Sequence, residues 1–435
     1  MSETIKEKFI INGFAGKKSL KGKLRVSGAK NAALKLLPAS LLFEDKVLFS
    51  NVPEIEDIGR MADLLRGSGA IVKKKERGVY EIDPSKIKNG DLDYEISKRL
   101  RASVVLTGPM LSRFGKVTFP HPGGCVIGAR PIDIFLEGFE KMGARTSAVK
   151  KGDKESFVIK ARGGKLHGAE IFFKQQSVTA TETFMMAGVL AKGKTILKNS
   201  AMEPEITHLA EFLIKGGAKI SGAGTTTIEI EGGGMLKMGG QEFKVMPDRI
   251  ETGSFLILAV LAGKDIEITD CNPVNIEALI ELLKLSGAKI KIGETNIIVK
   301  ENKNLKSVSV KTHEYPGFPT DLQSPMVVFL TQTKGESLVF ETIFEGRLNY
   351  TESLVRMGAN IEIWDPHRIM VKGPSNLKGK VLESPDLRAG LAFVIASIVA
   401  KGESVVHNVY NIDRGYEQIE ERLKKIGVDI KRVKN

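Results

Sequence analysis

The chain has 435 residues, of which 42% are hydrophobic and 27% are charged, an ordinary composition for a globular protein of two or three domains. Its formal net charge of +13 is compatible with nucleic acid, an acidic membrane surface or small anionic substrates as partners. The aromatic content of only 6% argues against platforms for base stacking.

The N-terminal sequence MSETIKEKFIING has no apolar stretch typical of a signal peptide, and the longest apolar segments, 255–262 and 393–400, are too short to span a membrane. The only cysteines are Cys125 and Cys271, too few for a disulfide framework. Both observations fit a cytoplasmic protein. The six histidines show no metal-ligand spacing, so we expect no structural metal.

Along the chain, an apolar helical pattern ends repeatedly in a turn of glycine and a small residue, followed by a short strand-like segment. Glycine at the end of an amphipathic helix provides a left-handed C-cap. The spacing of about 70 residues is too long for the common solenoid repeats. The six turns are Gly69-Ala70, Gly143-Ala144, Gly217-Ala218, Gly287-Ala288, Gly358-Ala359 and Gly427-Val428.

A second signature has the same period. It is a helix of small and apolar residues, a turn and then a strand. Clear copies lie at 185–199, 256–270, 326–342 and 393–408, and looser copies at 37–51 and 104–119. Helices that are apolar all round are deeply buried. Alternating strands and helices predict an α/β fold, which we expect to form two pseudo-symmetric domains of three units each.

Several segments match one family closely. They are SGAKNAA at 27–33, RAS at 101–103, PGGCVIGARPID at 122–133, PDRIETG at 247–253, FPTD at 318–321, FEGR at 344–347, DLR at 386–388 and DRGY at 413–416. On these segments the chain resembles the UDP-N-acetylglucosamine 1-carboxyvinyltransferase family over essentially its full length. The resemblance implies an inside-out α/β barrel fold of six βαβαββ-like units, with an active site in a cleft between two three-fold pseudo-symmetric domains. One domain is expected at 30–244, and the other combines 1–29 with 245–435.

Lys30 and Asn31 follow a strand-like segment and a glycine turn, and they precede an apolar helix. Such a helix start suits an anion, because its free N–H groups point outward. A capped helix with a solvated Lys30 is the alternative. The resemblance assigns Lys30 to phosphoenolpyruvate and Asn31 to the bound substrates.

Cys125 lies in a segment rich in glycine and proline, which predicts a loop. A lone cysteine is usually buried and inert, but an exposed loop with His121 and Arg130 nearby favours a reactive thiol. The resemblance makes Cys125 the group that protonates the methylene carbon of phosphoenolpyruvate, a thiol that also adds covalently to the enolpyruvyl group. It further implies inactivation by the epoxide fosfomycin at this residue. Cys271 is interpreted as structural.

Scattered arginines are candidates for the anionic groups of the substrate. Any single arginine is most often a surface residue, whereas a phosphate and a carboxylate on one small molecule need several fork-shaped donors. The resemblance places Arg130, Arg388 and Arg414, with Lys30, around phosphoenolpyruvate. It places Arg101 and Arg347 near the shared site, and it predicts that Lys30, Cys125, Asp321 and Arg414 converge.

Asp321 follows a Phe-Pro-Thr sequence and is either a helix cap or a functional carboxylate. The resemblance gives it a contact with the sugar 3-hydroxyl, as general base, with Asp386 as the second candidate for proton transfer. Four positions depart from the family pattern, namely Gln175, Thr179, Met202 and Asn411. The uridine side is expected at Arg130, Pro131, Ile132, Asp133, Ile134, Gln175, Gln176, Ser177, Val178 and Ile343.

The implied reaction is an addition–elimination that joins the enolpyruvyl group of phosphoenolpyruvate to the 3-hydroxyl of UDP-N-acetylglucosamine and releases phosphate, without metal or organic cofactor. It begins peptidoglycan precursor synthesis. The expected partners are these two small molecules, with neither nucleic acid nor membrane. The rivals are 5-enolpyruvylshikimate-3-phosphate synthase, which shares the architecture but lacks the cysteine loop, and a basic RNA-binding repeat protein, for which that loop would have no explanation.

Overall fold

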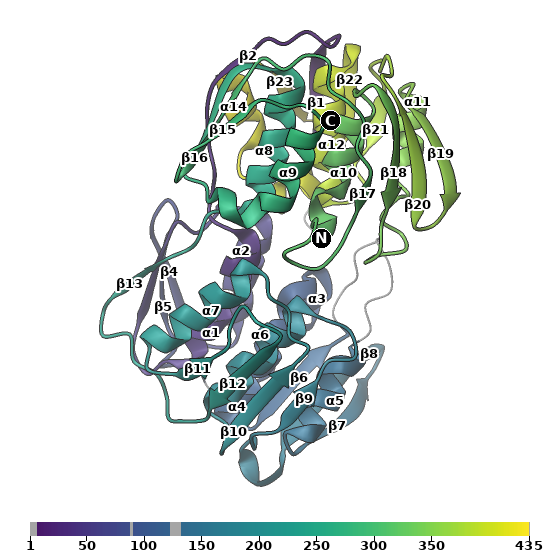
Figure 1. Ribbon diagram of the computed structural model, residues 1–435. Helices are drawn as coiled ribbons and strands as arrows, with labels where there is room; N and C mark the ends of the chain where they lie inside the picture. Colours follow the sequence, from purple (N-terminus) through teal and green to yellow (C-terminus); the bar gives the residue numbers. More distant parts are fainter. Residues whose placement is uncertain (1–6, 88–89, 122–131, 435) are drawn as a thin grey trace. The chain divides into compact units, whose positions relative to one another are not determined.

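The computed structural model describes residues 7–87, 90–121 and 132–434, and these residues form two compact units (Figure 1). The 28–246 unit contains the described residues between these two numbers, and the 247–434 unit also contains residues 7–27. The chain therefore changes unit at 27–28 and again at 246–247, where the sequence places the two changes at 29–30 and 244–245.

Within the described residues, the order strand, helix, strand, helix, strand, strand recurs in six copies, of which the second lacks a full first strand and the sixth takes its last strand from the start of the chain, and this confirms the predicted repeat. The first copy is β2 (Leu20–Arg25), α1 (Lys30–Ala39), β3 (Val47–Ser50), α2 (Glu56–Gly67), β4 (Ile71–Glu76) and β5 (Val79–Asp83). The second is α4 (Thr107–Phe114), β6 (Lys116–Pro120), α5 (Asp133–Lys141), β7 (Ala144–Lys151) and β8 (Lys154–Ala161), with its first strand reduced to a bridge between Asp91 and Thr118. The third is β9 (Glu170–Phe172), α6 (Val178–Val189), β10 (Lys194–Lys198), α7 (Pro204–Lys215), β11 (Lys219–Ser221) and β12 (Thr227–Glu231).

The other three copies follow the same order. The fourth is β13 (Glu242–Lys244), α8 (Arg249–Ala262), β14 (Gly263–Thr269), α9 (Glu277–Leu285), β15 (Ile290–Ile292) and β16 (Asn296–Lys300). The fifth is β17 (Val310–Lys311), α10 (Gln323–Leu330), β18 (Gly335–Phe340), α11 (Thr351–Arg356), β19 (Asn360–Asp365) and β20 (Arg368–Gly373). The sixth is β21 (Val381–Glu383), α12 (Leu387–Val399), β22 (Lys401–His407), α14 (Ile419–Lys425) and β23 (Asp429–Lys434), completed by β1 (Glu7–Phe14), and the short helices α3 (Tyr94–Arg99) and α13 (Tyr410–Asp413) lie between the repeated elements.

Five of the six sheets in the described residues share one pattern, in which a parallel pair continues into antiparallel strands, whereas the strands of β6-β8-β7 are all antiparallel. The orders are β13-β3-β5-β4, β6-β8-β7 and β11-β12-β10-β9 in the 28–246 unit, and β15-β16-β14-β2, β17-β18-β20-β19 and β21-β22-β1-β23 in the other. β1 pairs antiparallel with both β22 and β23, so the two ends of the chain complete one sheet. β2 pairs with β14, and β13 pairs with β3, so each unit contains the strand that precedes a helix of the other.

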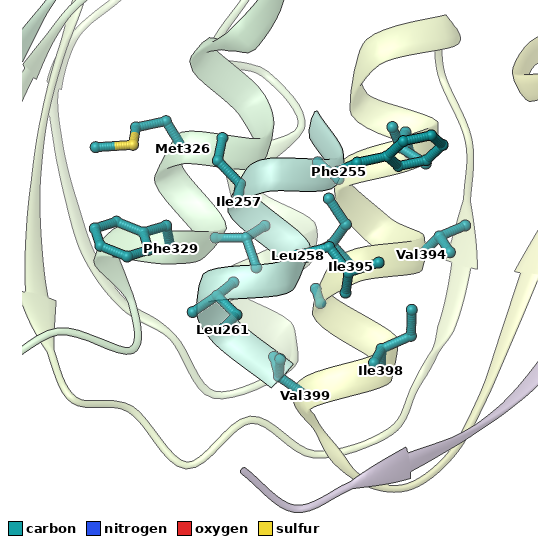
Figure 2. Close-up of a cluster of buried hydrophobic side chains, with 14 of the residues drawn as sticks. Phe255, Ile257, Leu258, Leu261, Met326, Phe329, Val394, Ile395, Ile398 and Val399 are labelled. Atoms are coloured by element: carbon teal, nitrogen blue, oxygen red, sulfur yellow. The ribbon is translucent and has the colours of Figure 1, made fainter. Parts of the chain in front are cut away.

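Three almost completely buried helices form the centre of the 247–434 unit. Figure 2 shows Phe255, Leu258 and Leu261 of α8 among side chains of α10 and α12 such as Phe329 and Ile395. α1, α4 and α6 are similarly buried in the 28–246 unit. These are the helices of the second sequence signature, whose apolar residues face every side and leave no polar stripe for solvent.

The amphipathic helices end as the glycine pattern predicts. All six predicted glycines have positive φ values, between 84° at Gly143 and 105° at Gly358. This conformation favours glycine, because a side chain there would collide with the backbone. In the part of the chain that the structure describes, no helix is both long and apolar enough to cross a membrane.

Candidate active site

The candidate residues lie where the central helices begin. Lys30 is the first residue of α1, and Ser177 caps α6 by accepting a hydrogen bond from the N–H of Ala180. Arg101 opens the 3-10 helix Arg101–Leu106, which leads into α4. Helix N-termini carry free N–H groups and partial positive charge, so these positions favour anions.

The same arrangement recurs in the 247–434 unit. Asp248 caps α8, and Asp386 caps α12. Asp321 lies in the 3-10 helix Thr320–Leu322 directly before α10. The repeat therefore explains why functional candidates far apart in sequence occupy equivalent places in the fold.

Asp321 is held by two arginines. Nη1 of Arg347 donates to its Oδ1 at 2.8 Å, while Nε and Nη2 of Arg388 donate to its Oδ2 at 3.1 and 2.8 Å. Both arginine side chains are only 7% exposed, whereas that of Asp321 is 25% exposed. The structure thus brings together three of the residues that the sequence predicted, in one partly open cluster.

The charges of this cluster determine its protonation. Burial alone would raise the pKa of Asp321, but Arg388 and Arg347 outweigh it and hold that pKa well below its usual range. Burial would lower the pKa of Arg388, and the Asp321 carboxylate raises it. At neutral pH Asp321 is therefore a carboxylate held between two guanidinium groups, which are also the groups that bind anionic ligands well.

Asp386 has a structural contact of its own. Its Oδ1 accepts hydrogen bonds from the backbone N–H groups of Arg388 at 2.8 Å and Ala389 at 3.0 Å. The carboxylate therefore fixes the first turn of α12, from which the Arg388 side chain extends. Nη1 of Arg388 also donates to the hydroxyl of Tyr416 at 3.0 Å, so Arg388 is oriented from two directions.

Lys30 is buried and pairs with a residue that sequence reasoning missed. Its ammonium lies 2.6 Å from Oδ2 of Asp57, in the first turn of α2, and the two side chains are 9% and 3% exposed. The alternative of a solvated Lys30 is therefore wrong, because the α1–α2 packing encloses it. An acidic residue at the start of the next helix was the only sequence signal for this pair.

The remaining predicted residues have varied surroundings. Arg101, Asn31 and Arg414 are half-buried, with Arg414 directly after α13. Ile132, Asp133 and Ile134 lie at the start of α5, and Gln175, Gln176, Ser177 and Val178 lead into α6, where Nε2 of Gln176 donates to the Ser200 carbonyl at 3.2 Å.

Cys125, Arg130 and Pro131 lie outside the described residues. The predicted convergence of Lys30, Cys125, Asp321 and Arg414 therefore stays a prediction.

Glu341 is a second residue that sequence reasoning missed. Its buried carboxylate accepts hydrogen bonds from the Thr320 hydroxyl at 2.9 Å and from the N–H groups of Ile343 at 2.9 Å and Phe344 at 3.2 Å. It therefore joins the residue before Asp321 to the segment predicted for the uridine side. Glu341 directly follows β18, and in the sequence it looks only like part of that strand, so no sequence signal indicated its role.

Cys271 behaves as a buried thiol. Its side chain is 2% exposed, and burial raises its pKa to about 11. Such a thiol is a poor nucleophile at neutral pH. Among residues 7–87, 90–121 and 132–434 no group of three or more His, Cys, Asp and Glu side chains has the arrangement of a metal site.

Known proteins resemble this chain along its whole length. Residues 14–423 match the family described as EPSP synthase (3-phosphoshikimate 1-carboxyvinyltransferase). UDP-N-acetylglucosamine 1-carboxyvinyltransferase of Koribacter versatilis is 42% identical over 98% of this chain and 96% of its own, and that of Desulforapulum autotrophicum is 43% identical over 96% and 98%.

Solved structures share the fold at low sequence identity. The enolpyruvyl transferase NikO from Streptomyces tendae superposes with a TM-score of 0.86 at 22% identity, covering 99% of both chains. EPSP synthase from Acinetobacter baumannii gives a TM-score of 0.75 at 18% identity, covering 98% of this chain and all of that one. The expected fold class is thereby confirmed.

Proposed function

The chain belongs to the EPSP synthase family and, within it, to the UDP-N-acetylglucosamine 1-carboxyvinyltransferases, and we propose that it transfers the enolpyruvyl group of phosphoenolpyruvate to the 3-hydroxyl of UDP-N-acetylglucosamine. The observation that carries the proposal is the identity of 42–43% to these transferases over nearly the whole chain. The proposal includes the cytoplasm as the location and the start of peptidoglycan precursor synthesis as the context.

The reaction proceeds in two steps. The sugar 3-oxygen forms a bond to C2 of phosphoenolpyruvate while C3 gains a proton and the 3-hydroxyl loses one, which produces a tetrahedral adduct. The adduct then loses a proton from C3 and the phosphate from C2, which regenerates the double bond as an enol ether. Atoms and charge balance without any redox change, so the chemistry is proton transfer and stabilisation of anions.

Lys30, Arg388 and Arg414, with Arg130, are assigned to the phosphate and carboxylate of phosphoenolpyruvate, and Arg101 and Arg347 to neighbouring contacts. The hydrogen bonds that place the Arg388 guanidinium beside Asp321, the proposed base, support this assignment for Arg388. Guanidinium groups suit both anionic ends of the substrate, because their paired donors match two oxygens at once.

Asp321 is assigned as the base for the 3-hydroxyl. With two arginines on its carboxylate it is a hydrogen-bond acceptor but a weak base. An anionic substrate that attracts Arg388 away from Asp321 would let the pKa of Asp321 return toward its usual value. Binding of phosphoenolpyruvate would then activate the base that the second substrate needs.

Cys125 is assigned as the acid that delivers the proton to C3, and Asp386 is the second candidate for proton transfer. The capping bonds of Asp386 support a more limited part, in which it holds Arg388 at the helix start. Asn31 is assigned to the bound substrates. The uridine contacts proposed are those at 130–134, 175–178 and Ile343.

Phosphate release from phosphoenolpyruvate tests the proposal, with UDP-N-acetylglucosamine and shikimate 3-phosphate as alternative acceptors. The second acceptor is included because the matching family is described by the shikimate activity. Release that depends on UDP-N-acetylglucosamine supports the proposal. Release only with shikimate 3-phosphate would replace it with the sister activity.

A further inference from the structure

Arg432, on the last strand β23, donates all five of its N–H groups to three carboxylates. Nη1 reaches Glu7 at 2.7 Å and Oδ2 of Asp413 at 2.8 Å, and Nη2 reaches Oδ1 of Asp413 at 2.7 Å. Nε and Nη2 bind Glu420 at 2.5 and 3.1 Å. The guanidinium plane also lies against Phe9, 5.0 Å from the ring centre.

This arrangement fixes the position of its carboxylates as well as pairing their charges. One positive charge stands among three negative charges, and the arginine side chain remains 23% exposed. Isolated exposed ion pairs contribute little to stability, whereas a bidentate arginine shared by several carboxylates contributes more. Partial burial would lower the pKa of Arg432, but these carboxylates raise it. What the arrangement provides is geometry, because the fork of Arg432 binds both oxygens of Asp413 at once.

Asp413 is the residue directly before Arg414, and the segment on the other side of Arg414 is also fixed. A side chain at Gly415 would lie 2.6 Å from Leu387, so this backbone packs tightly against the start of α12. The hydroxyl of Tyr416 accepts the hydrogen bond from Arg388. Arg414 thus stands between one residue clamped by Arg432 and another joined to the Asp321–Arg388 cluster.

We propose that Arg432 is a positioning residue that holds Arg414 for the anionic substrate through Asp413. This inference rests on the proposed function, in which Arg414 binds phosphoenolpyruvate. Arg432 itself contacts no substrate. Loss of Arg432 frees the Asp413 side chain and the adjoining backbone that orients Arg414. The affinity for phosphoenolpyruvate therefore falls, while the rate of the chemical step changes less.

The test compares Arg432→Lys with the wild-type full-length enzyme. Lysine keeps the positive charge but cannot bind both Asp413 oxygens. We expect KM for phosphoenolpyruvate to rise about 10-fold, kcat to change less than about 3-fold and KM for UDP-N-acetylglucosamine to stay within about 2-fold. Asp413→Asn, which removes the other half of the clamp, should reproduce this pattern.

Arg368→Met is the matched control, because Arg368 also pairs with an aspartate, Asp365, in the same unit but far from Arg414 in sequence. It should leave all three constants unchanged. A general structural role of Arg432 would instead lower the melting temperature and change both KM values together, which would overturn the inference.

A double mutant shows whether Arg432 affects phosphoenolpyruvate binding through Arg414 or independently of it. In an Arg414→Lys background, Arg432→Lys should raise KM for phosphoenolpyruvate by less than about 2-fold, because the group it positions is already altered. Full additivity of the two changes would overturn the inference. Absence of wild-type turnover would overturn the proposed function and this inference with it, whereas wild-type turnover with an unchanged KM in Arg432→Lys overturns the inference alone.

Discussion

Asp321 and Arg388 are joined by two hydrogen bonds to a single oxygen, since Nε and Nη2 of the guanidinium both donate to Oδ2 of the carboxylate. Arg347 holds the other oxygen. The proposed base and a proposed ligand for phosphoenolpyruvate therefore neutralise each other before any substrate binds. If the proposed assignments hold, phosphoenolpyruvate competes with Asp321 for Arg388, and the binding of one substrate is then coupled to the reactivity of the other.

Replacing Asp321 tests the assignment of the base. Asp321→Asn keeps the shape but removes the proton acceptor, so kcat should fall by roughly a hundredfold or more. KM for phosphoenolpyruvate should not rise, because Arg347 and Arg388 lose their internal counter-ion. Steady-state kinetics with varied phosphoenolpyruvate and saturating UDP-N-acetylglucosamine measure both, with Asp365→Asn as the control carboxylate. An unchanged kcat would remove Asp321 from the chemical step.

The two cysteines should differ sharply toward fosfomycin. A thiol such as Cys271, whose pKa burial raises to about 11, is almost entirely protonated at neutral pH and should not react. Cys125 should form the adduct, and Cys125→Ser should resist the epoxide because a hydroxyl is a far weaker nucleophile. Cys125→Asp is expected to keep activity, since a carboxylic acid also donates a proton.

Mass spectrometry after treatment in the presence of UDP-N-acetylglucosamine locates the adduct. Cys271→Ser is the matched control and should be modified like the wild type. Modification at Cys271, or no modification of an enzyme that is demonstrably active, would contradict the assigned role of Cys125.

Asp57 should matter for stability as well as for binding. Asp57→Asn leaves the ammonium of Lys30 buried without its ionic partner, and breaking a buried pair in this way typically costs about 3–5 kcal/mol of unfolding free energy. Asp63→Asn is the control in the same helix, because the Asp63–Arg66 pair is exposed and should contribute less than about 1 kcal/mol. Urea unfolding distinguishes the two. Equal effects would show that Lys30 does not depend on Asp57.

A buried contact between a lysine and a glutamate in the 28–246 unit should make stability depend on pH. Nζ of Lys35 on α1 lies 3.1 Å from Glu182 on α6, and burial raises the pKa of Glu182 to about 8, although Lys35 opposes the shift. Because this pKa lies above the unfolded value of about 4.3, the folded state retains a proton that the unfolded state loses. The stabilisation is complete below pH 4 and is lost as the pH rises to 8.

Glu182→Gln should flatten this dependence. Between pH 5 and 8 the wild type should lose about 1–3 kcal/mol more unfolding free energy than the variant does. Only the slope of unfolding free energy against pH is diagnostic, because the variant also leaves Lys35 without its carboxylate at every pH. Parallel curves from urea unfolding across this range would show that Glu182 keeps its ordinary protonation.

The repeat could be predicted because its signals are local. A glycine with positive φ ends each amphipathic helix, and helices such as α8 and α12 are apolar on every side. These patterns depend on near neighbours in the chain and therefore survive in one sequence. The six-unit fold and the family follow from them and from the quoted motifs.

The partners within the site could not be predicted, since they depend on packing between elements distant in sequence. Asp57 meets Lys30 only because α2 packs on α1, and Arg432 meets Asp413 only because β23 lies beside α13. The Glu341 carboxylate accepts a hydrogen bond from the Thr320 hydroxyl, 21 residues away and beyond α10 and β18, and no periodicity in the sequence indicates this pairing. The motifs identify the candidate charged groups, whereas the fold determines which oppositely charged residue each of them pairs with.

Identification of the product tests the central claim most directly. Enzyme, phosphoenolpyruvate and UDP-N-acetylglucosamine are incubated, and the purified nucleotide product is analysed by proton and carbon NMR. The account predicts a vinyl methylene whose ether oxygen is on carbon 3 of the sugar, formed in equal amount with phosphate. Attachment at another hydroxyl, or an unmodified nucleotide sugar while shikimate 3-phosphate is converted, would contradict it.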